Sequence, residues 1–104
     1  MGKFVLAYTG GKMAETEAEQ QAVIAAWSAW FGSLGTAVVD GGNPFGPSKT
    51  VASDGSITDG GSSALTGYSI LTADSLAAAA DLAKGCPILT VGGSVEVYET
   101  FDVT

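Results

Sequence analysis

Hydrophobic residues recur with two different periods along this chain. Every second residue is typical of a strand, and every third or fourth residue is typical of a helix. In the stretch from Lys3 to Tyr8, Phe4, Leu6 and Tyr8 would lie on one side of an extended chain and Val5 and Ala7 on the other, so both sides are apolar. This pattern predicts a strand at the centre of a sheet, with both of its faces covered. Thr9 and two glycines after it end the run.

A helical period follows. Thr16 and Glu19 form a capping box, and Gly35 suits the C-cap, so we expect a helix near 16–34. The two tryptophans could form an aromatic platform for a ligand, but packing on the sheet is the favoured interpretation because they lie on the buried stripe. That stripe comprises Val23, Trp27, Trp30 and Leu34.

The middle of the chain is poor in large apolar side chains and rich in turn formers. A second strand is predicted from Thr36 to Asp40, followed by a long glycine-rich connection that reaches Gly67. A marginal strand or hairpin is expected within it, around 49–53. Loops of this length are often functional.

The last third predicts a strand, a short helix and a strand. The first strand covers 67–72, and Asp74 is the expected N-cap of a helix at 75–84. Alanine is frequent in this helix, whose sheet-facing side would comprise Leu76, Ala79, Ala80 and Ala83. The closing strand is expected at 94–103, with Phe101 and Val103 on one face and Tyr98 on the other.

The element order β-α-β-(β)-β-α-β predicts one α+β domain over 1–104. Two crossovers on one antiparallel sheet give the ferredoxin-like, split-βαβ arrangement, with both helices on one face. The other face keeps apolar side chains and needs a cover, so we expect a homodimer. The expected core comprises Leu6, Val23, Trp27, Trp30, Leu34, Val39, Ile70, Leu76, Ala83, Val95 and Val97.

Composition narrows the possible chemistry. The chain has 46% hydrophobic and 14% charged residues and a net charge of −7, which makes nucleic acid an improbable partner. It has no histidine and no arginine, so the commonest general base and the bidentate phosphate fork are missing. Lone Cys86 excludes an internal disulfide and is an improbable nucleophile without a base.

The sequence shows no motif for a metal ion, a cofactor or a membrane. The acidic residues show no metal-ligand spacing, and we expect no metal and no cofactor. No apolar run approaches 18 residues, and the first apolar run is short for a signal peptide. We therefore expect a cytoplasmic protein that does not bind membranes.

The candidate ligand-binding residues surround the glycine-rich connection. Asp40 follows an apolar run and could be a general base with a raised pKa, although capping of its own turn up to Asn43 is the favoured interpretation. Asp59 is explained by an Asp-Gly turn. Tyr8 and Tyr68 could place hydroxyls in a pocket, but residues of this type are more often found in a sheet or an interface.

Several blocks resemble the YCII-related (DGPF-domain) family, nearly from end to end. They are Trp27-Ser-Ala-Trp30-Phe31, Asp40-Gly41-Gly42, Gly67-Tyr68-Ser-Ile70, Asp74-Ser-Leu76, Ala83-Lys-Gly-Cys-Pro87 and Gly92-Gly93-Ser94-Val95-Glu96-Val97. The resemblance implies a dimeric α/β-barrel-like assembly in which two sheets pack face to face. Most members have no assigned activity, and a few relatives use a His-Asp pair on aromatic ring substrates.

Two departures from the family favour a protein without catalysis. The Asp-Gly-Pro-Phe motif is reduced to Asp59-Gly60-Gly61-Ser62, and the catalytic histidine has no counterpart. We therefore expect a dimeric module that binds a small ligand or a partner in a regulatory role. The alternative is a small, dehydrochlorinase-like lyase or isomerase that uses Asp40 or Asp59 with tyrosines.

The expected ligand cleft lies between the sheet and the connection from Asp40 to Ser63. Phe45, between two prolines, is either a lid over this cleft or a plug into the partner subunit. We favour the plug because a large apolar side chain on a rigid loop is better buried in a neighbour. Tyr98 is the second residue assigned to the dimer interface.

Overall fold

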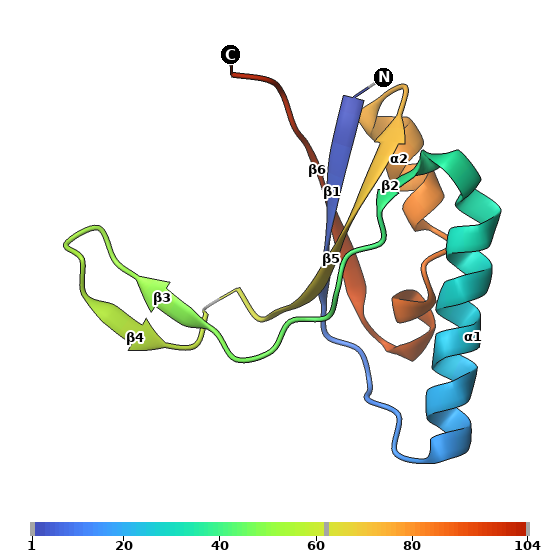
Figure 1. Cartoon of the computed structure of the whole chain (residues 1–104), viewed down its shortest axis with the longest axis horizontal. Helices are drawn as coiled ribbons and strands as arrows, with labels where there is room; N and C mark the ends of the chain where they lie inside the picture. The colour runs from blue at the N-terminus through green and yellow to red at the C-terminus, as the bar shows by residue number, and fades with distance from the viewer. Residues whose placement is uncertain (1, 62, 104) are drawn as a thin grey trace.

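The computed structural model describes residues 2–61 and 63–103, and these form a four-stranded antiparallel sheet, two α-helices and a separate hairpin (Figure 1). The sheet order is β2-β5-β1-β6, which is compatible with the predicted ferredoxin-like fold. The elements are β1 (Gly2–Thr9), α1 (Glu17–Leu34), 3-10 helix η1 (Gly35–Ala37), β2 (Val38–Asp40), β3 (Lys49–Val51), β4 (Ile57–Asp59), β5 (Leu65–Ala73), α2 (Leu76–Ala83), 3-10 helix η2 (Pro87–Val91) and β6 (Ser94–Glu99).

The helix ends follow local capping, with one correction. The Thr16 hydroxyl accepts a hydrogen bond from the backbone N–H of Glu19 at 3.1 Å, as the capping box predicted. Asp74 was the wrong cap for α2. The hydroxyl of Ser75 accepts from the Ala78 N–H at 3.0 Å, because Ser75 is the last extended residue before the helix.

One face of the sheet carries the core, and both α-helices contribute to it. Phe4 and Leu6 of β1 and Leu71 of β5 are almost completely buried. The rings of Trp27 and Tyr8 meet edge to face, with centroids 5.1 Å apart, so this tryptophan packs on the sheet as expected. The main cluster contains Leu6, Tyr8, Leu71, Trp30, Ala83, Cys86 and Ile88, and Phe4 packs in a second cluster with Ala73 and Ala79.

Three expected core residues are exposed instead. Val23 precedes the second half of α1, whose aromatic side chains make the core contacts. Val39 alternates with half-buried Val38 and therefore points away from the helix-covered face. Leu76 lies in the first turn of α2, where Ala79 and Ala83 face the sheet; Ala80, expected beside them, is also exposed.

The last strand is shorter than predicted. Thr100 still donates its N–H to the carbonyl of Lys3 at 3.0 Å, but the pairing of β6 with β1 ends at Glu99, opposite Phe4. The tail (residues 100–103) then leaves the sheet, and Phe101 and Val103 are 83% and 84% exposed.

The other face of the sheet, which we call the open face, is covered by neither helix (Figure 1). The strand register places Val5 opposite Ile70 on one side and Tyr98 on the other. Ala7 similarly pairs with Tyr68. Val5, Ile70 and Tyr68 are half-buried and Tyr98 is 53% exposed, so the predicted two-sided apolar pattern exists but only one side is covered.

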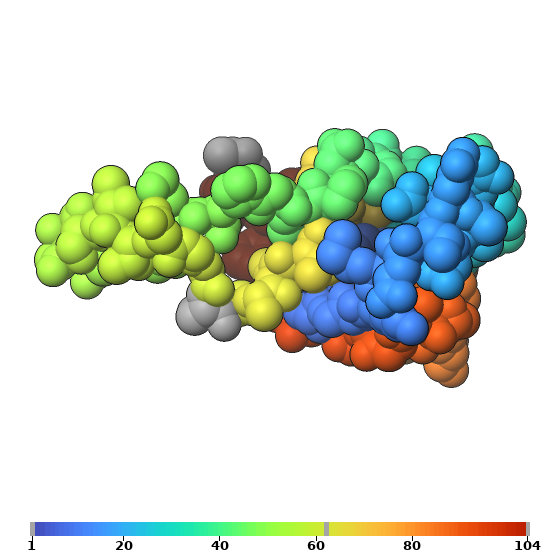
Figure 2. Space-filling model, turned by 90° about the horizontal axis from the view of Figure 1, so that it is seen from below, coloured from blue at the N-terminus to red at the C-terminus, as the bar shows by residue number. Residues whose placement is uncertain are grey.

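The hairpin β3–β4 extends away from the body, on the side of the open face (Figures 1 and 2). We call residues 46–61 the arm, and all of them are exposed. The Cα radius of gyration is 15.2 Å, whereas a compact domain of this length has about 13 Å. Among the described residues, no helix combines the length and the apolar character required to cross a membrane.

Candidate functional site

The segment after β2 runs along β5 as an irregular continuation of the sheet edge. Asp40 pairs with Ile70 across a register shift. Further on, the Tyr68 N–H donates to the carbonyl of Asn43 at 3.4 Å, and the Phe45 N–H donates to the carbonyl of Thr66 at 2.9 Å. Residues 40–45 are therefore held against the sheet, whereas the arm after them is free.

Gly42 makes this close approach possible. Its φ is +74°, and a Cβ atom placed there would lie 1.7 Å from the carbonyl oxygen of Tyr68. That distance is far inside van der Waals contact, so any side chain at this position would push the segment away from β5.

Two linked hydrogen bonds, donated by buried hydroxyl groups, hold the same segment from the helix-covered side of the sheet. Tyr8 donates to the hydroxyl of Ser69 at 2.7 Å, and Ser69 donates to the carbonyl of Gly41 at 2.7 Å. Burial raises the pKa of Tyr8 to about 12 and also raises the pKa of the neighbouring Cys86 thiol. Tyr8 is thus a structural hydrogen-bond donor beneath the predicted ligand site, not a hydroxyl that faces a ligand.

Tyr68 and Phe45 form a stacked aromatic pair on the open face. Their ring centroids are 5.8 Å apart and the planes differ by 19°. Phe45 remains 46% exposed, so one side of its ring is available to another molecule. This pair lies where the glycine-rich segment meets the sheet.

The two candidate carboxylates do not converge. Asp40 is exposed, and its Oδ1 accepts from the N–H of Gly42 at 2.8 Å, within its own turn. Asp59 lies on β4 in the arm, with its side chain 91% exposed and 2.6 Å from the ammonium group of Lys49. The Asp59 side chain and residues 47–49 line a shallow hollow of about 350 Å³.

The structure therefore brings together part of the predicted set. Asp40, Asn43 and Tyr68 lie along one edge, with Tyr8 beneath them, and Asp59 lies apart in the arm. Tyr98 occupies the open face on the far side of β1 and bonds to Glu96, whose carboxylate raises the pKa of the tyrosine.

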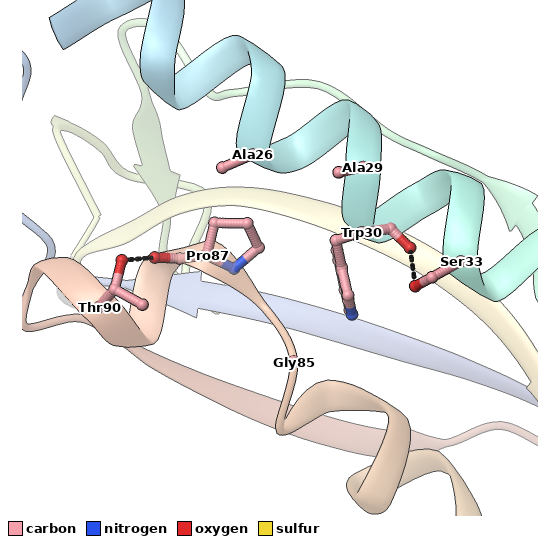
Figure 3. Close-up of a pocket in the computed structure, with 7 residues that line it drawn as sticks. All are labelled: Ala26, Ala29, Trp30, Ser33, Gly85, Pro87 and Thr90. Carbon is pink, nitrogen blue, oxygen red and sulfur yellow. Dashed lines mark hydrogen bonds between the residues drawn. The ribbon is translucent and has the colours of Figure 1, made fainter.

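A groove on the opposite side of the molecule was not foreseen from the sequence. It has a volume of about 450 Å³ and runs between α1 and the segment Gly85–Thr90, with Trp30 at its base (Figure 3). The Trp30 indole N–H is already bonded to the carbonyl of Leu82 at 3.2 Å. The available signal was the small residues of α1 that flank the tryptophan, Ala26, Ala29 and Ser33.

The chemistry open to these sites is limited. Residues 2–61 and 63–103 contain no group of three or more carboxylate or thiol side chains placed to hold a metal ion. At the β5 edge the polar atoms facing outward belong to Asp40 and Asn43, beside an aromatic pair. The two hollows described above lie elsewhere, one in the arm and one between α1 and the segment Gly85–Thr90.

Comparison with protein-family models, with curated proteins and with solved structures gives no match to this chain. The YCII-related assignment remains a prediction from the sequence blocks quoted above.

Proposed function

We propose that this protein is a non-catalytic homodimeric module that binds a small ligand or a regulatory partner at the rim of its open face. The observation that carries the proposal is the open face itself. Its row of apolar side chains is left without a cover by the described chain. Exposed apolar patches of this kind mark interaction sites.

The assembly we propose is the dimeric α/β-barrel-like one, with two open faces packed together. Val5, Ile70 and Tyr98 form a continuous apolar row across three strands, which suits face-to-face sheet packing about 10 Å apart. The resemblance to the YCII-related family supports the same assembly, and the cytoplasmic location belongs to the same proposal.

The ligand would bind where the dimer leaves the edge of the face open. There Tyr68 offers an apolar surface beside Phe45, which we expect to contact the partner, while Asp40 and Asn43 provide acceptors and a donor at the rim. We therefore expect a small molecule with an aromatic or alicyclic part and a hydrogen-bonding group.

The lyase or isomerase alternative has less support. Asp40 bonds within its own turn, and Asp59 lies in the arm with Lys49. The hydroxyl of Tyr8 is buried and bonded to Ser69. A general base needs to come within hydrogen-bonding reach of its substrate together with an acid partner, and these residues do not form such a pair.

Native mass spectrometry of protein purified without additives tests the proposal. We expect a species of twice the 10.4 kDa chain mass, with a non-covalent adduct that is lost in Tyr68→Ala while the dimer persists. Ile24→Ala, a change on the exposed side of α1, is the matched control and should retain the adduct.

Two outcomes would contradict the proposal in different ways. A monomer at every concentration would remove the dimer. A dimer without any adduct, whose melting temperature responds to none of a broad panel of cyclic small molecules and which captures no protein, would remove the binding role.

A further inference from the structure

The arm has too little support of its own to be explained by the single chain. Its two strands have three residues each, and Val51 lies directly opposite Ile57. These side chains are 66% and 63% exposed. An isolated two-stranded hairpin is marginally stable in water, and a cover over the apolar pair at its outer half would stabilise it.

The arm and the tail leave the sheet at opposite ends of the strands. The arm follows Phe45, whose neighbours Thr66 and Gly67 lie beside the end of β1 at Tyr8. The tail follows Thr100, which is bonded to Lys3 at the other end of β1. Both project on the side of the open face and flank it (Figure 1).

The area of exposed surface fits a second copy of the chain as the occupant. The solvent-accessible surface is 7007 Å², whereas a monomer of this mass typically exposes about 5,400 Å². The excess is about 1,600 Å² for each chain by the same scaling. A stable interface takes about 800 Å² from each partner and an obligate one takes more, so the open face, arm and tail together supply enough.

We propose that the arm of each copy crosses the dimer interface and packs Val51 and Ile57 against Phe101 and Val103 in the tail of the other copy. The inference rests on the face-to-face dimer proposed above. It adds that contacts between arm and tail join the two copies at both ends of the sheet. Residues 46–51 span about 20 Å when extended, and stacked sheets lie about 10 Å apart. The outer half of the arm therefore reaches past the plane of the partner's sheet.

The pairing of arm with tail follows from symmetry and charge. A two-fold axis perpendicular to the strands places the arm end of one copy over the tail end of the other. An axis parallel to the strands would instead bring the two tails together, and with them Glu99 and Asp102 of both copies. In the arm-to-tail arrangement these carboxylates instead meet an arm that carries Asp54 and the ion pair Lys49–Asp59, so fewer like charges face one another than between two tails.

Disulfide trapping tests this arrangement. Cys86 is 1% exposed, so the natural thiol does not compete with cysteines placed on the surface. Two single variants, Ile57→Cys and Phe101→Cys, are mixed, allowed to exchange subunits, oxidised mildly and separated on a denaturing gel without reductant. We expect a covalent dimer in the mixture, and at least tenfold less in either variant alone.

The control pairs Phe101→Cys with Ile24→Cys, which is 65% exposed and matches Ile57 in side chain and exposure. This pair should give only background cross-linking. Strong cross-linking of Ile57→Cys alone would show arm against arm and overturn the proposal. Background cross-linking in the test mixture, with light scattering still reporting a dimer, would overturn it while leaving the dimer intact. A monomer by light scattering would remove both.

Discussion

The two faces of the sheet are built from neighbouring residues of the same strands, yet only one is covered. On β5, Leu71 is completely buried under the helices, and the adjacent Ile70 lies half-buried on the open face. On β1, Leu6 and Val5 differ in the same way. The side chains are similar, so the difference arises from cover and not from composition. An apolar pattern on both sides of a strand therefore does not by itself show which side the chain covers.

Alanine substitutions on the two faces of β5 should have the largest effects. They should distinguish side chains that stabilise the fold from side chains that stabilise the dimer. Leu71→Ala should lower the free energy of unfolding by about 2–5 kcal/mol, because it empties a filled core position. Ile70→Ala should lower it by clearly less in dilute protein. Its effect should grow with protein concentration, since the lost contacts belong to the dimer. Urea denaturation at two protein concentrations measures the change in unfolding free energy for each variant. Equal changes that do not depend on protein concentration would contradict the proposed difference between the two faces.

The edge where the two faces meet should be sensitive to a single methyl group. Gly42→Ala should cost about 2–4 kcal/mol in unfolding free energy, because the methyl group meets the Tyr68 carbonyl and the backbone φ is positive. Gly46→Ala is the control: its φ is not positive and its Cβ would meet nothing within 4 Å. If both variants unfold at the same urea concentration, residues 40–45 are not held against β5 as described.

Tyr8, on the covered face, should make the free energy of unfolding depend on pH in the alkaline range. The pKa of Tyr8 is raised from 10.0 to about 12, so the unfolded chain loses this proton first and stability falls as pH rises from 10 to 12. The loss should be about 2–3 kcal/mol for a shift of this size. Tyr8→Phe should lose about 1 kcal/mol at neutral pH and then show a flatter profile. A variant whose profile matches the parent's would contradict this assignment.

A smaller effect is expected where the open face meets its rim. Phe45→Ala should weaken the dimer by about 1–3 kcal/mol, the usual cost of truncating an aromatic anchor at an interface. The exposed side of the Phe45 ring, opposite Tyr68, is the part we expect the partner to contact. Sedimentation across a range of concentrations measures the change. A dissociation constant equal to the parent's would favour the lid over the ligand cleft instead.

The sequence predicted those features that depend on neighbouring residues. Thr16 and Glu19 lie three positions apart, so the start of α1 could be read from local capping alone. The order and types of the elements allow only a few topologies. The predicted antiparallel sheet with two helices is one of them, and it is the arrangement observed.

The features that were missed depend on residues distant along the chain. The bonds that join Tyr8 to Ser69 and Ser69 to Gly41 span 61 and 28 positions, and no local pattern encodes them. The requirement for glycine at position 42 arises from a carbonyl on β5. The end of β6 at Glu99 is not marked by a local pattern either, since the apolar alternation continues to Phe101 and Val103.

The central claim is that the open face is covered by a second copy of this chain, and the molar mass in solution tests it most directly. Light scattering at micromolar concentration should give twice the 10.4 kDa chain mass for the parent and for Ile24→Lys. Ile70→Lys, which places a charge in the apolar row of the open face, should give a monomer that keeps its helical signal. A parent protein that remains at 10.4 kDa at every concentration would contradict the account.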